Sequence, residues 1–71
     1  MTEEAMRELK ALLEYLIKHN AEHASEILEL AARAENLGKA QAHEHLVQGV
    51  ELLQQANERL QAALSTLGDR P

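Results

Sequence analysis

The sequence predicts an all-α fold: an antiparallel two-helix hairpin of coiled-coil type that dimerises into a four-helix bundle. The composition is dominated by Ala, Leu, Glu, Gln, Lys and Arg, which is typical of long helices. Apolar residues recur at alternating spacings of three and four over two long segments, and one short break containing glycine separates these segments. The 71 residues are expected to form a single unit, 1–71.

The ends of both helices can be placed from capping signals. Thr2 is a suitable N-cap for a helix over about 3–36, because its hydroxyl can accept a bond from a free backbone N–H. Gly38 can adopt the left-handed conformation that ends helices, which predicts a turn at about 37–39. The second helix is expected over about 40–67. So short a connection makes the two helices antiparallel.

A seam with the heptad spacing of coiled coils runs along each predicted helix. In the first helix it consists of Met6, Leu9, Leu13, Leu16, Asn20, His23, Ile27, Leu30, Ala34 and Leu37. In the second helix it consists of His43, Leu46, Val50, Leu53, Asn57, Leu60, Leu64 and Leu67. A column of small residues flanks the second seam: Ala42, Gly49, Ala56 and Ala63. We interpret this column as allowing close antiparallel packing of the two helices.

Further aliphatic residues lie beside these seams, where a hairpin has no second layer to cover them. They are Leu12, Ile17, Leu28, Val47 and Leu52. So short a chain without cysteine cannot add disulfides to a small core, so a metal with N or O ligands, oligomerisation, or both are expected to supply extra stability. We therefore expect an isologous homodimer. The alternative is that these aliphatic side chains are simply exposed, as many are on protein surfaces.

Composition and charge argue against several classes of function. The net charge of −5 repels phosphate backbones, and one aromatic residue offers little base stacking, so nucleic acid is not an expected partner. No apolar run is long enough to span a membrane, and the acidic N-terminus lacks the features of a signal peptide, which favours a cytoplasmic protein. No nucleophile–base pair or phosphate loop is recognisable, so we do not expect an enzyme.

Polar residues interrupt the aliphatic seams at one level. Asn20 and His23 of the first helix are expected to lie near Asn57 of the second, with His19 one turn before His23. Buried polar groups are costly unless they are satisfied. One interpretation is structural: a hydrogen-bonded layer that sets register and oligomeric state.

The other interpretation of this layer is a metal site. His19 and His23 are four residues apart, so their imidazoles lie on one helix face and can converge on one ion. Glu22 and Glu26 follow each histidine by three residues and can ligate the ion or orient an imidazole, with Asn20 and Asn57 as auxiliary groups. A two-fold axis nearby would bring a second set of ligands. Imidazole ligands favour nickel, zinc, cobalt or copper.

The stretch from Leu16 to Ala24, with His19-Asn20-Ala21-Glu22-His23 at its centre, resembles a small uncharacterised helical-hairpin domain of prokaryotes with an HNxEH signature. That domain also has an Ala-Asn-Glu-x-Leu stretch, which stands here at 56–60. The resemblance implies that His19, Asn20, His23 and Asn57 form one constellation. It also favours nickel as the metal, and it implies a metalloprotein-maturation protein as a partner.

The function that these observations favour is that of a small metal-handling protein. The alternative is a purely structural coiled-coil module for interaction or dimerisation, natural or designed, in which the polar layer sets the register.

Overall fold

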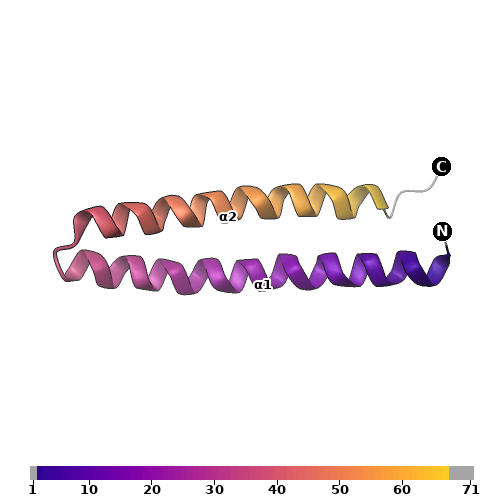
Figure 1. The fold of residues 1–71 in the computed structure, drawn as a ribbon, viewed down its shortest axis with the longest axis horizontal. Coiled ribbons are helices and arrows are strands. Elements are labelled where there is room, and N and C mark those ends of the chain that lie inside the picture. The colour runs from indigo at the N-terminus through magenta and orange to yellow at the C-terminus, as the bar shows by residue number, and fades with distance from the viewer. Residues whose placement is uncertain (1, 68–71) are drawn as a thin grey trace.

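The computed structural model describes residues 2–67, which form two long helices joined by a tight turn. Helix α1 spans Glu3–Asn36 and helix α2 spans Ala40–Leu67. The helices lie side by side and antiparallel, so the structure is a narrow rod (Figure 1) of 53 × 17 × 13 Å. The predicted all-α, two-helix hairpin is thereby confirmed. Pairing into a four-helix bundle is a property of two chains and stays a prediction.

Side-chain and backbone caps define both ends of α1. The Ala5 N–H donates to the Thr2 hydroxyl (3.0 Å), as expected for an N-cap. At the other end Gly38 has a φ of 76°, and the N–H groups of Gly38 and Lys39 donate to the carbonyls of Glu35 (3.0 Å) and Ala34 (2.9 Å). These are the two bonds of a Schellman motif, which satisfies carbonyls at the helix end. The chain reverses within this motif, so α2 packs back along α1.

The α2 side of the interface is as predicted. The buried and half-buried positions of α2 include all eight residues of the predicted seam, with Val47 in addition. Val50 is the most buried of them, at 3% exposure. The spacing along α2 was therefore sufficient to identify the face that α2 turns toward α1.

The α1 side differs from the prediction in half of its positions. The shared column Met6, Leu13, Asn20, Ile27 and Ala34 is half-buried, as predicted. The second column of the interface is shifted by one residue: Lys10, Ile17, Ala24 and Ala31 contribute to it. The predicted members Leu9, Leu16, His23, Leu30 and Leu37 are exposed. The apolar face of α1 is wider than one helix can cover, and α2 covers the flank with the small, buried Ala24 and Ala31.

The interpretation of the small-residue column on α2 is also wrong for the single hairpin. Ala42, Gly49, Ala56 and Ala63 are all exposed, and a Cβ added to Gly49 would meet no atom within 4 Å. This column therefore does not bring α1 close. It lies along an open flank of α2.

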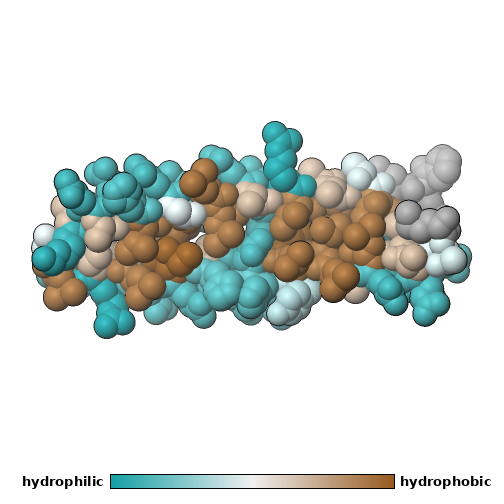
Figure 2. Space-filling view, viewed as in Figure 1, coloured by the Kyte–Doolittle hydropathy of each residue, from teal (hydrophilic) through white to brown (hydrophobic). Residues whose placement is uncertain are grey.

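Neither described helix is both long enough and apolar enough to cross a membrane. Apolar residues nevertheless form extensive patches on the surface, and hydrophilic residues interrupt them near the middle of the rod (Figure 2).

Replacing each of the two glycines in the described part of the chain with alanine should change the stability of the hairpin in opposite directions. Gly38→Ala places a side chain at a positive φ and should destabilise the hairpin by about 1 kcal/mol. Gly49→Ala adds a methyl group in open space within a helix and should stabilise it by up to about 1 kcal/mol. Urea unfolding of both variants at one protein concentration measures the difference. Equal midpoints would contradict this account of the turn.

Candidate functional site

Two asparagines form the polar part of the interface between the helices. The Asn20 side-chain amide donates to the Asn57 side-chain oxygen (2.9 Å), and the Asn57 amide donates to the backbone carbonyl of Ile17 (2.9 Å). Both side chains are half-buried. The pair can form only in one register of the hairpin, since a slip by one turn would separate the two amides. The pair therefore stabilises this register. Because both amides are hydrogen-bonded, their partial burial costs little free energy.

Two histidines lie outside the interface, one turn apart on the open flank of α1. Their Nε2 atoms are 2.9 Å apart, and the rings are almost perpendicular, at 80° with centroids separated by 4.2 Å. Tyr15 stacks on His19 from the preceding turn, with ring centroids 5.3 Å apart and an angle of 14°. This stacking limits the rotation of the His19 ring. The His23 side chain is 50% exposed, so an ion or a second protein can reach it.

Glu26 orients the second of these imidazoles. The Oε1 atom of Glu26 lies 3.1 Å from Nδ1 of His23. A carboxylate only accepts hydrogen bonds, so His23 donates from Nδ1, and in the neutral ring Nε2 then carries no proton. The lone pair of His23 Nε2 is then free, and in this state it accepts a bond from the Nε2–H group of His19. A carboxylate that bonds the far side of a ligating imidazole is common in metal sites.

The spacing of the two Nε2 atoms matches the requirement of a shared metal ion. With metal–nitrogen bonds of about 2.05 Å, a separation of 2.9 Å corresponds to an angle of about 90° at the metal. That angle suits two neighbouring ligands in a square-planar or octahedral site. A proton now on His19 Nε2 would have to leave or move to Nδ1 for an ion to bind.

One chain supplies only part of a coordination sphere. Within residues 2–67, no group of three or more His, Cys, Asp or Glu side chains is placed to hold a metal ion. Glu22 is exposed, and no hydrogen bond joins it to either histidine among these residues. Two imidazoles are therefore the ligands that a single hairpin offers.

The structure divides the predicted polar layer into two parts. Asn20 and Asn57 meet inside the interface, whereas His19, His23 and Glu26 form a cluster on the open flank of α1. The prediction that His23 belongs to the seam between the helices is therefore wrong. The stacking of Tyr15 on His19 was not predicted, although the position of Tyr15 one turn before His19 was a usable signal. His43 bonds the Ala31 carbonyl through Nδ1 (2.8 Å) and belongs to the interface near the turn.

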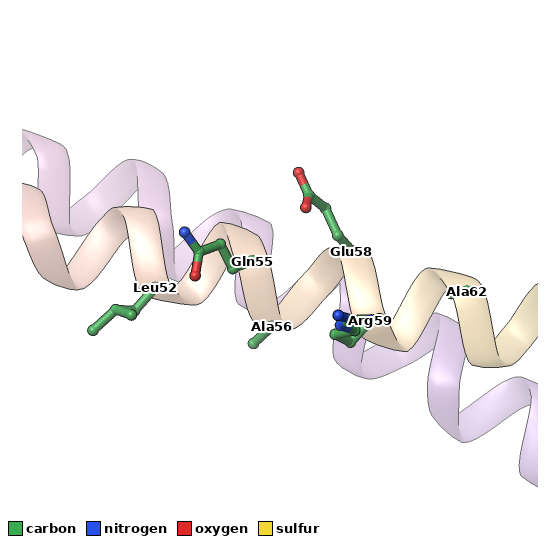
Figure 3. A pocket seen from close by; sticks show the side chains of 6 residues that line it. All are labelled: Leu52, Gln55, Ala56, Glu58, Arg59 and Ala62. Atoms are coloured by element: carbon green, nitrogen blue, oxygen red, sulfur yellow. The ribbon is translucent and has the colours of Figure 1, made fainter.

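A hollow along the outer surface of α2 offers no comparable chemistry. It is lined by side chains of α2 alone: Leu52, Gln55, Ala56, Glu58, Arg59 and Ala62. These side chains do not converge, since Leu52 and Ala56 project from one side of the helix and Glu58 from the other (Figure 3). The His19–His23–Glu26 cluster is therefore the candidate functional site.

Comparison with protein families gives one match. Residues 9–67 match the model of a family described as "Domain of unknown function (DUF8180)". Comparison with the curated proteins found no match, and comparison with the solved structures found none either. The matched residues include α1 from residue 9 onward, all of α2 and the candidate site.

The asparagine pair predicts an asymmetry between single and double substitutions. Asn57→Ala leaves the Asn20 amide without its partner and removes the second bond of the Ile17 carbonyl, and it should cost about 1–3 kcal/mol of stability. Asn20→Leu combined with Asn57→Leu removes donor and acceptor together and should be close to neutral or stabilising. Urea unfolding measures both effects, and Gln54→Ala on the exposed surface of α2 serves as control. The role assigned to the pair is wrong if Asn57→Ala and this control have the same urea midpoint.

Proposed function

The chain belongs to the family described as a domain of unknown function (DUF8180), and we propose that it is a small non-enzymatic protein that binds a divalent transition metal through His19 and His23. The observation that carries this proposal is the separation of 2.9 Å between the two Nε2 atoms. The two Nε2 atoms already lie close together on successive turns of one helix, so little conformational entropy is lost when an ion binds.

The residues around the pair have different roles in this proposal. Glu26 holds the His23 ring by its Nδ1–H group and so orients the ligating nitrogen. Tyr15 fixes the ring of His19 by stacking. Glu22 lies three residues after His19 and directly before His23. It can supply a carboxylate only after its side chain moves. Asn20 and Asn57 support the site indirectly, by fixing the helix that presents the histidines.

The ligand type restricts the choice of metal. Imidazole nitrogens favour nickel, zinc, cobalt and copper over calcium and magnesium, which prefer oxygen ligands. The resemblance of the His19–His23 stretch to the HNxEH domain favours nickel among these four. In that case a cytoplasmic location and a partner in metalloprotein maturation complete the proposal. Dimerisation into a four-helix bundle would add the ligands that one hairpin lacks.

A purely structural role is the second candidate, and the asparagine pair favours it. Asn20 and Asn57 satisfy each other inside the hairpin and set its register without any ion. In that case the exposed leucines of α1 would serve association alone, and the histidines would bind no ion. The two candidates differ in one measurable property, the response of the folded protein to metal ions.

The metal proposal predicts thermal stabilisation by a suitable ion. The protein is first stripped with a chelator and then heated with nickel, zinc, cobalt or copper in turn. An ion present at about 100 times its dissociation constant should stabilise the native state by roughly 2.7 kcal/mol. His23→Ala should abolish this shift, because it removes one of two ligands. The proposal fails if no ion raises the unfolding midpoint of the wild type.

Two further variants make this experiment specific. Glu26→Gln should weaken metal affinity by about 10- to 100-fold, because loss of an outer partner of a ligating imidazole has that effect. Glu29→Gln is the matched control, since it removes an exposed carboxylate of α1 outside the cluster and should leave the shift unchanged. A full loss of the shift in Glu29→Gln would assign metal binding to other residues.

A further inference from the structure

The open flank of α1 carries a second seam with the same heptad spacing as the first. It consists of two columns of residues: Leu9, Leu16, His23, Leu30 and Leu37 in the inner column, and Leu12, His19, Glu26 and Arg33 in the outer column. Its leucines remain between 39% and 75% exposed in the hairpin. A heptad seam of exposed leucines is typical of a helix that packs against another helix. The candidate metal ligands lie in the middle of this seam.

Two columns of α2 lie on the same side of the hairpin. They are Ala42, Gly49, Ala56 and Ala63 next to the interface, and His45, Leu52, Arg59 and Thr66 farther out. In both helices the centre of the open columns lies about 100° around the helix axis from the centre of the interface. Because the two helices run in opposite directions, both sets of columns lie on one side of the hairpin. Leu52 and Ala56 project together from α2 (Figure 3). We call these four columns the pairing face.

The α1 column that lies next to the interface is symmetric about His23. On α1, Leu16 and Leu30 lie seven positions on either side of His23, and Leu9 and Leu37 lie fourteen positions on either side. A second α1, laid antiparallel on the first, would therefore place leucine on leucine and His23 on His23.

Of the two α2 columns, the one next to the interface has the same symmetry at the same level of the rod. Gly49 with Ala56, and Ala42 with Ala63, are centred between positions 52 and 53. The bond between Asn20 and Asn57 and the bond between His43 and Ala31 place His23 level with positions 51–54 of α2. The two centres of symmetry thus coincide, so one two-fold axis relates both helices to their copies.

Charge also favours a second copy as the occupant of this face. The chain carries a net charge of −5, which would oppose self-association over most of its surface. All but one of its twelve acidic residues fall outside the four columns, and Glu26 is the exception. With Arg33 and Arg59, the face has a formal charge of +1. The pairing face is therefore apolar and close to neutral, and two copies can approach there without strong repulsion.

We infer that a second copy of the chain binds the pairing face about a two-fold axis at the level of His23, so that four imidazoles, His19 and His23 of each copy, form one metal site. This inference rests on the proposed function for its metal and on the symmetry of the face for its partner. Two ligands from each chain complete the four-coordinate shell that one hairpin leaves half formed. The small columns of α2 allow the two α2 helices to approach closely across the axis.

Engineered disulfides test the pairing without any metal. The chain contains no cysteine, so Gly49→Cys with Ala56→Cys introduces the only two thiols. Within one helix these positions are about 10 Å apart, beyond the reach of a disulfide of about 7 Å. Across the axis each thiol meets the other position of the second copy. The matched pair should therefore give a covalent dimer under mild oxidation in the presence of chelator, as seen on a gel without reductant.

Gly49→Cys with Ala63→Cys is the control, because these positions belong to the same column but are out of register across the axis. It should stay mainly monomeric on the same gel, and circular dichroism should show equal helix content for both variants. Absence of dimer in the matched pair, or equal dimer in both, would overturn the pairing face. Neither result affects the thermal shift that tests metal binding by the histidines.

Metal stoichiometry of the wild-type protein tests the shared site. Titration calorimetry with nickel, or with whichever of the four ions gives the thermal shift, should show one ion for each two chains. One ion for each chain, together with cross-linking of the matched pair, would overturn the shared site and leave the dimer. Cross-linking of the matched pair without binding of any ion would overturn the proposed function and the shared site together.

Discussion

The width of the apolar face of α1 governs the rest of the structure. Three columns of this helix are mainly apolar, but α2 packs against only two of them. The covered flank contains Ala24 and Ala31, whose small side chains are almost fully buried. The open flank contains leucines at the corresponding positions, together with His19 and His23. Packing of α2 on the alanine flank therefore leaves the bulky leucines and the imidazoles on one continuous exposed surface.

The asparagine pair makes this choice of flank and register specific. Aliphatic side chains at heptad spacing would tolerate a slip of one heptad, because leucine would still meet leucine. A slip would leave Asn20 and Asn57 unpaired, at a cost comparable with much of the stability of a small domain. The pair thus also fixes which positions of α2 lie level with His23. Without that register the symmetric columns of the two helices would not share a centre.

Part of this arrangement could be predicted from the sequence, and the rest could not for a physical reason. Thr2 and Gly38 mark the helix ends by local chemistry, since a hydroxyl cap and a positive φ depend on few neighbours. The face of α2 was correct because only one of its flanks is rich in large apolar residues. In α1 the columns of Leu9 and of Lys10 fit the same alternation of three and four around a shared column. Periodicity alone cannot decide between them, and His23 was placed on the wrong flank for that reason.

In the proposed arrangement metal binding and pairing depend on each other, because His19 and His23 lie on the open flank of α1. Two imidazoles on one hairpin hold an ion weakly, because water must fill the remaining positions, whereas four imidazoles leave fewer of them to solvent. An ion bound by both copies stabilises the dimer by as much as dimerisation strengthens the binding of the ion, since coupling free energies are reciprocal. Glu26 takes part in this coupling through the His23 ring that it orients. A small hairpin of this kind would therefore change its oligomeric state with metal supply, with His23 at the axis as the residue common to both equilibria.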